Sequence, residues 1–152
     1  MRALLFRIIY FFVFFGTSTI AGMLIPFLQY KGFDPIQTGS LISLFTLSGL
    51  VGLFSIGYFC DKLKTIKKVL FPSLIITTIT GAIAILFNKG IVFYIGFFLM
   101  GLFNSMLGPL CDSWIMESSN DIKSRFGQLR AFGSVGWAFG VLIVGFVISN
   151  LA

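Results

Sequence analysis

Hydrophobic residues fall into five long runs, separated by short segments that carry most of the charges. The runs cover residues 4–28, 37–60, 68–87, 91–114 and 129–152. A run of about 20 apolar residues is long enough for a helix to cross a bilayer. Five separate spans in lipid must be helical, because a helix satisfies its own backbone hydrogen bonds and an open sheet does not. The pattern therefore predicts an all-α, polytopic membrane protein with five transmembrane helices.

The composition agrees with this class and excludes a soluble domain. Hydrophobic residues make up 57% of the chain and charged residues only 11%, whereas a soluble domain is about 25% charged. We therefore expect the lipid bilayer as a partner and no nucleic acid, although the net charge is +6.

The basic residues predict an orientation in the cell membrane. Of the 11 basic residues, two (Lys31 and Lys89) lie at one set of run ends, and the others lie at the opposite set: Arg2, Arg7, Lys62, Lys64, Lys67, Lys68, Lys123, Arg125 and Arg130. Cytoplasmic loops carry the excess of Lys and Arg. The N-terminus is then predicted in the cytoplasm, and the last residue of this chain on the outside.

Residues for catalysis or metal binding are scarce. The chain has no histidine and two cysteines, Cys60 and Cys111. Without histidine, two separate cysteines do not provide the four ligands of a zinc site, and we expect both to be small buried residues. No nucleophile elbow, phosphate loop or metalloprotease motif occurs. The sequence thus predicts no metal, no cofactor and no enzyme activity.

Two small-residue motifs leave alternatives open. Gly136 and Gly140 have the spacing that lets membrane helices approach closely. We expect packing within one bundle, with dimerisation as the alternative. The hydroxyl residues Thr17, Ser18 and Thr19 either line a wet cavity or bond to carbonyls of their own helix.

An acid and an arginine stand at the edges of the fourth and fifth runs. If the chain between the runs turns near Asp121, then Asp112 and Arg130 are each nine residues from the tip. Antiparallel helices would place them at similar depth, where membrane charges are paired or face water. Three interpretations remain: a structural pair, a polar patch that binds a hydroxylated ligand, or two charges at the headgroups.

The loop between the second and third runs, "GYFCDKLKTIKK", resembles the signature loop of the major facilitator superfamily. The matching residues are Gly57, Asp61, Lys62, Lys67 and Lys68. The resemblance implies a loop that latches the cytoplasmic ends of two transporter halves and helps to set the inward–outward equilibrium. The family favours glycine three residues after the aspartate, where this chain has Lys64.

The stretch from residue 109 to residue 138 is similar to the oligosaccharide:proton symporters, the lactose permease group, and to phenylpropionate permeases. Pro109 and Asp112, the "FG" of Phe126 and Gly127, and "RAFGSVGWA" from Arg130 carry the resemblance. It implies that Asp112 and Arg130 bind sugar hydroxyls and that Trp137 stacks on the sugar. Ser134, in the same motif, is a further candidate substrate-binding residue.

The substrate branch stays open between a sugar and an aromatic acid. The sugar branch has glutamate at the position of Asp112, whereas the phenylpropionate branch has aspartate, as here. Trp137 favours the sugar branch.

The resemblance covers the whole chain but less than half of a twelve-helix transporter. It implies that residues 1–152 form an incomplete N-terminal six-helix domain of a proton-coupled symporter. Such a chain is not expected to transport alone, and its partner would be the missing C-terminal half. The alternative is a self-contained five-helix membrane subunit that binds a partner or a separately encoded second half.

Overall fold

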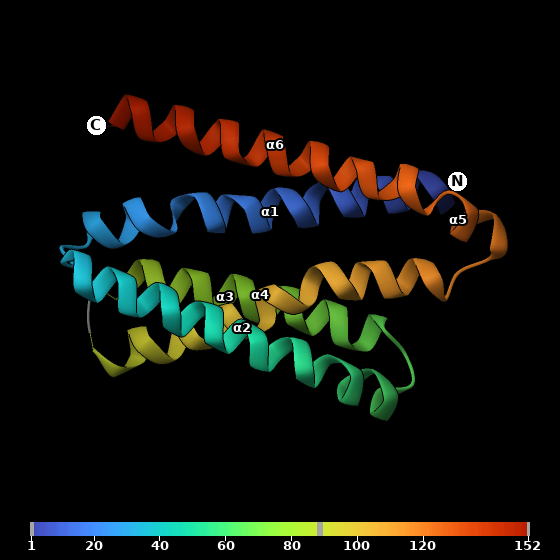
Figure 1. Ribbon diagram of the computed structural model, residues 1–152, viewed down its shortest axis with the longest axis horizontal. Helices are drawn as coiled ribbons and strands as arrows, with labels where there is room; N and C mark the ends of the chain where they lie inside the picture. The colour runs from blue at the N-terminus through green and yellow to red at the C-terminus, as the bar shows by residue number, and fades with distance from the viewer. Residues whose placement is uncertain (1, 88–89, 152) are drawn as a thin grey trace. The chain divides into compact units, whose positions relative to one another are not determined.

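The computed structural model of the chain describes residues 2–87 and 90–151. Within these residues the helices are α1 (Arg2–Tyr30), α2 (Pro35–Leu63), α3 (Lys67–Leu86), α4 (Ile91–Met116), α5 (Asn120–Ser124) and α6 (Phe126–Leu151) (Figure 1). The basic residue Lys89 and the expected helix end at Ala152 lie outside the described residues.

The helices confirm the predicted fold class. In the described part of the chain, five helices are long and apolar enough to cross a membrane, namely α1, α2, α3, α4 and α6. The protein is therefore all-α and polytopic. The prediction succeeds because each span is a nearly uninterrupted apolar run.

Helix α2 begins at Pro35, two residues before the expected start. The Asp34 side chain accepts a hydrogen bond from the Gln37 backbone N–H at 2.7 Å, and the Gln37 side chain accepts from the Asp34 N–H at 3.4 Å. This reciprocal capping box satisfies two N–H groups at the helix start. Proline fits the first helical position because it lacks an N–H that would need a partner there.

The segment before α6 also differs from the prediction. The short helix α5 was not expected, and α6 begins at Phe126 rather than at residue 129. Neither feature was predicted, because this segment is polar and lacks the apolar run on which the prediction of the helices was based. Arg125 forms an exposed ion pair with Asp121, at 3.2 Å between Nη2 and Oδ1. Such i,i+4 pairs stabilise a helix only slightly.

Two compact units make up the fold. The first comprises Met1–Tyr30 and Cys111–Ala152, and the second comprises Lys31–Leu110. Most of α4 belongs to the second unit, whereas its last residues, which include Asp112, belong to the first.

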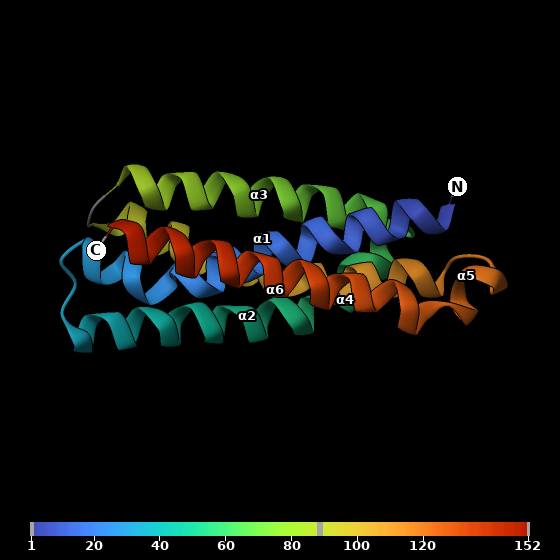
Figure 2. The same ribbon diagram turned by 90° about the horizontal axis from the view of Figure 1, so that it is seen from above.

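In the first unit, α1 and α6 run side by side in the same direction (Figures 1 and 2). Glycines of α6 make the close approach possible. A Cβ atom at Gly136 would collide with the Phe11 carbonyl oxygen, and one at Gly140 would collide with the Ser18 hydroxyl. The glycine pair therefore packs within the chain, as expected, and this contact fixes the register of α6 against α1.

The second unit contains a similar contact between α2 and α4. A Cβ atom at Gly52 would collide with the Leu102 carbonyl oxygen, and one at Gly101 with the carbonyl oxygen of Phe45. Among the described residues, each unit thus contains a pair of helices that approach closely at glycine.

Candidate functional site

The first unit brings three polar side chains together from three helices. Asp112 lies near the end of α4, Arg130 in the first turns of α6, and Tyr10 in the first half of α1. Asp112 and Arg130 are 18 residues apart in the sequence, yet Arg130 Nη1 lies 3.6 Å from Asp112 Oδ2. The structure therefore pairs the two charges that the loop geometry placed at similar depth.

Tyr10, rather than Arg130, holds the Asp112 carboxylate in place. The Tyr10 hydroxyl donates a hydrogen bond to Asp112 Oδ1 at 2.6 Å. The 3.6 Å separation from Arg130 to Oδ2 exceeds the 2.7–3.2 Å typical of an N–H···O hydrogen bond. Arg130 is thus attracted to Asp112 by charge, while its five N–H donors remain available to other acceptors.

Exposure separates the roles of the three residues. Tyr10 is fully buried, whereas the Asp112 and Arg130 side chains are 27% and 56% exposed. A guanidinium is costly in hydrocarbon, so charged side chains in membrane segments face a protein interior or a water-filled cavity. The exposed side of Arg130, in the first turns of α6, therefore suits water, lipid headgroups or protein rather than hydrocarbon.

Nothing in the sequence pointed to Tyr10 as a site residue. It lies in an aromatic stretch, "IIYFFVFF", where a tyrosine resembles any other packing residue. The structure stacks its ring on Phe14 at 5.7 Å between centroids. Gly133 of α6 leaves the space for both rings, since a Cβ there would lie 3.0 Å from Phe14 and 3.2 Å from Tyr10. Only the packing of α1 near the end of α4 reveals that the hydroxyl reaches Asp112.

The other candidate residues of α6 follow Arg130 along one side of the helix. Ser134 is one turn further on, and Trp137 is seven residues from Arg130, about 20° short of two turns. Both side chains are exposed, Trp137 to 42%. The Arg130 guanidinium also lies over the Phe126 ring at 5.8 Å. This side of α6 thus offers donors and an aromatic face.

The mid-membrane hydroxyls of α1 do not contribute to this surface. Thr17 donates to the Phe14 carbonyl at 3.1 Å, and Ser18 and Thr19 donate to the Phe15 carbonyl at 2.9 and 2.8 Å. Of the two interpretations, bonding to their own helix is therefore the one observed.

The residue types of the cluster are able to recognise hydroxyl groups. A carboxylate accepts hydrogen bonds and a guanidinium donates them, so a hydroxyl group finds both partners within a few ångströms. Among the described residues, no group of three or more His, Cys, Asp or Glu side chains could hold a metal ion.

The loop between α2 and α3 lies in the second unit and turns within three residues. Helix α2 ends at Leu63, and α3 begins at Lys67. Lys64 adopts a left-handed backbone with φ of 51° and ψ of 19°, the conformation that glycine adopts most readily. The turn is therefore tight even though this chain has lysine at that position. Asp61, Lys62 and Lys67 are exposed around it, with Lys62 Nζ 5.6 Å from the centre of the Tyr58 ring.

We expect Lys64→Gly to raise the free energy of unfolding. A left-handed backbone costs a non-glycine residue about 1–2 kcal/mol, and the larger unfolded-state entropy of glycine offsets part of that gain. The expected net gain is about 0.5 kcal/mol, measured by thermal unfolding in detergent micelles. Lys62→Gly is the matched control, because it lies in the last helical turn of α2, where glycine should cost up to about 1 kcal/mol. Equal effects of the two variants would contradict the assigned turn.

Comparisons with known proteins point to one family. The sequence profile of the Major Facilitator Superfamily matches residues 7–152. A maltose permease from Geobacillus stearothermophilus is 24% identical, and the match covers 99% of this chain and 39% of the permease. An uncharacterized transporter of Bacillus subtilis, YwbF, is 27% identical over 93% of this chain and 36% of its own length. No solved structure matches the chain.

The chain thus spans less than two fifths of the length of each of these relatives. The match to the family profile begins in the first turns of α1 and continues through α6. It includes the helices that carry Tyr10, Asp112 and Arg130. The chain belongs to the Major Facilitator Superfamily.

Proposed function

We propose that this chain forms the N-terminal helices of a proton-coupled symporter for a sugar or another small hydroxylated solute. The observation that carries the proposal is the Asp112–Arg130 pair at an exposed side of the first unit, in a chain of a transporter family. Asp112 accepts hydrogen bonds from solute hydroxyls, and Arg130 donates them. Trp137 stacks on the solute, and Ser134 adds a hydrogen-bonding hydroxyl beside Arg130.

The charges of the site favour a neutral solute over an aromatic acid. Asp112 and Arg130 together have no net charge, so the site offers no excess positive charge to a carboxylate. The carboxylate of an acidic solute would have to compete with Asp112 for the guanidinium, and the Asp112 carboxylate would repel it. A sugar meets neither obstacle, and the maltose permease among the relatives supports this choice. Maltose is therefore the first solute to test.

The proposal includes a second half as the partner. Solute sites in such transporters lie between two repeats near the membrane midplane, and the exposed side of Arg130 leaves room for such a second repeat. The relatives extend well beyond the match, so the remaining helices are the natural partner. No cofactor is needed, because the proton gradient drives transport.

The loop that contains Gly57, Asp61, Lys62, Lys67 and Lys68 is proposed as the conformational latch. A Cβ atom at Gly57 would meet no other atom within 4 Å, so packing within its unit does not require glycine there. The loop is placed on the cytoplasmic side of the cell membrane by the positive-inside rule. The N-terminus is then cytoplasmic, and the end of α6 is outside.

This orientation predicts the side from which Lys64 is accessible. In a background with Cys60 and Cys111 replaced by serine, Lys64→Cys should resist an impermeant thiol reagent in intact cells. It should react in inverted vesicles. Gln37→Cys, at the opposite end of α2, should show the reverse pattern. Labelling of Lys64→Cys from outside would overturn the topology.

The transport proposal is tested by maltose uptake in proteoliposomes. The 152-residue chain alone should give no uptake, because it supplies one wall of a cavity and no second wall. Joined to the remaining helices of the Geobacillus maltose permease, it should give saturable uptake driven by an imposed proton gradient. Gradient-driven uptake by the chain alone would reject the half-transporter account. The proposed function would be rejected if a well-folded chimera gave no uptake under conditions in which the parent permease transports maltose.

A further inference from the structure

The Arg130 guanidinium lies over an aromatic ring of its own helix. Its Cζ atom is 5.8 Å from the centre of the Phe126 ring, within the distance of about 6 Å at which a ring face attracts a cation. Phe126 is the first residue of α6, and residues four positions apart are neighbours on a helix surface. Because Cα–Cβ bonds in a helix tilt toward its N-terminus, the Arg130 side chain leans back over the turn that begins at Phe126.

The Phe126 ring is a more rigid group than the side chain above it. Phe126 is half-buried, and Leu129 in the same turn is fully buried, so the first turn of α6 is fixed by packing. An aromatic side chain has only two rotatable χ angles, whereas a long arginine side chain loses much rotamer freedom when it is held in one place. The ring can therefore support the guanidinium at little entropic cost.

On the other side of the site, Tyr10 disfavours a closed ion pair between Asp112 and Arg130. A guanidinium binds a carboxylate most strongly through two parallel hydrogen bonds, one to each oxygen. Asp112 Oδ1 already accepts a hydrogen bond from the Tyr10 hydroxyl at 2.6 Å, and Arg130 Nη1 stays 3.6 Å from Oδ2. Two aromatic side chains, Tyr10 and Phe126, thus hold the two charges near each other without joining them.

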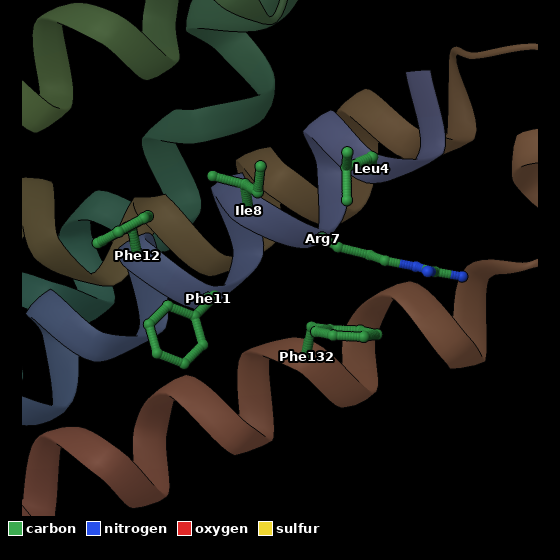
Figure 3. Close-up of a pocket in the computed structure, with 6 residues that line it drawn as sticks. All are labelled: Leu4, Arg7, Ile8, Phe11, Phe12 and Phe132. Carbon is green, nitrogen blue, oxygen red and sulfur yellow. The ribbon is translucent and has the colours of Figure 1, made fainter. Parts of the chain in front are cut away.

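A second contact between an arginine and a phenylalanine of α6 lies away from this site. Arg7 of α1 has its Cζ atom 5.1 Å from the centre of the Phe132 ring, and Figure 3 shows its side chain extending along that ring. Phe132 is two residues from Arg130, or about 200° around α6. The Arg7–Phe132 contact is therefore an internal control, with the same chemistry on the same helix.

We propose that Phe126 is a positioning residue of the solute site. The inference rests on the proposed function, because Phe126 acts only through the binding of solute by Arg130. The ring keeps the guanidinium beside Asp112 before the solute arrives, so less rotamer freedom is lost when the solute binds. The N–H groups of Arg130, which make no hydrogen bond to Asp112, then donate to solute hydroxyls.

The first measurement needs no solute. In the 152-residue chain with isotope-labelled arginine in detergent micelles, the ring current of Phe126 should shift the Arg130 Hε NMR signal upfield of the Arg125 signal. Arg125 pairs with Asp121 instead. Phe126→Leu, which keeps an apolar side chain without a ring, should abolish the shift, and Phe126→Trp should retain it. An Arg130 signal that is the same with phenylalanine and with leucine would overturn the proposal.

The second measurement is the maltose affinity of the chimera with the charge distribution of the ring varied at nearly constant shape. Mono-, di- and trifluorinated phenylalanine at position 126 withdraw negative charge from the ring face step by step. Affinity should fall at each step to a loss of about two- to fivefold, the strength of a cation–π contact at an exposed site. The same series at Phe132, whose ring lies against Arg7, should leave affinity unchanged.

The outcomes separate this inference from the proposed function. Constant affinity across the Phe126 series, in a chimera that loses affinity in Arg130→Ala, would reject the positioning role. A loss of thermal stability without a loss of affinity would also reject it, because that result describes a packing residue. Absence of maltose binding by the wild-type chimera would instead reject the proposed function and the solute role of Phe126 with it. The Arg130 NMR signal would then still decide whether the ring holds the guanidinium.

Discussion

Gly136→Leu is expected to force α1 and α6 apart and to lower the free energy of unfolding by about 3 kcal/mol, the upper part of the usual range for overpacking. Even a Cβ atom at this position would collide with the Phe11 carbonyl oxygen. That oxygen belongs to the backbone of α1, so no side-chain rotation relieves the collision. Thermal or urea unfolding in detergent micelles measures the loss.

The matched control is Gly145→Leu in the same helix. A Cβ at Gly145 would have no atom within 4 Å, and leucine has a higher helix propensity than glycine. This variant should be neutral or slightly stabilising. If the two substitutions lower stability equally, the glycine contact between α1 and α6 is not the one described.

Arg130→Ala is expected to reduce maltose affinity at least a hundredfold in the chimera with the remaining permease helices. A hydrogen bond from a charged group contributes about 1.5–3 kcal/mol, and a guanidinium can donate two to neighbouring sugar hydroxyls. Losing both exceeds the 2.8 kcal/mol that corresponds to a hundredfold change. Membrane yield and thermal stability should remain near wild type, because Arg130 is more than half exposed and makes no hydrogen bond to Asp112. Isothermal titration with maltose measures the affinity.

Three further variants separate the contributions within the site. Asp112→Asn should reduce affinity to a similar extent, because it replaces the charged acceptor. Trp137→Ala should reduce the affinity for maltose by a smaller factor, and it should reduce the affinity for a linear solute even less. Tyr10→Phe keeps the ring that stacks on Phe14 and removes only the hydroxyl that bonds to Asp112. Its loss of maltose affinity therefore measures how much binding depends on holding the Asp112 carboxylate in place. Tyr94→Phe, in the second unit, is the control.

The features predictable from the sequence are those set by long-range pattern. The five spans follow from apolar runs that only helices accommodate in lipid. The Asp112–Arg130 pairing follows from equal distances to the loop tip. The glycine spacing in α6 predicted close packing, because a helix face without Cβ atoms lets any partner helix approach closely. Only the charge pairing needed a neighbour assumption, namely that consecutive spans joined by a short loop lie antiparallel.

The features that escaped prediction depend on neighbours or on local backbone geometry. Tyr10 becomes a site residue because its ring packs against Gly133 of α6 and its hydroxyl reaches Asp112 of α4. Arg7 was counted only as an orientation charge, since nothing local shows that it lies against Phe132. Lys64 stands where the resembling family favours glycine, and the turn there is formed by a left-handed backbone that lysine rarely adopts.

The central claim is that Asp112 and Arg130 serve a solute rather than the fold. A double-mutant cycle with Asp112→Asn, Arg130→Gln and both together tests it, with thermal stability and maltose affinity measured on the same chimera samples. If the pair binds solute, each single variant loses affinity and keeps most of its stability, and the double variant recovers no affinity. A structural pair behaves differently, because removing one partner leaves the other charge uncompensated, at a cost that the partial exposure of both side chains reduces toward the roughly 1 kcal/mol of a surface pair. Loss of stability in both single variants, with stability and affinity recovered together in the double variant, would contradict the assignment.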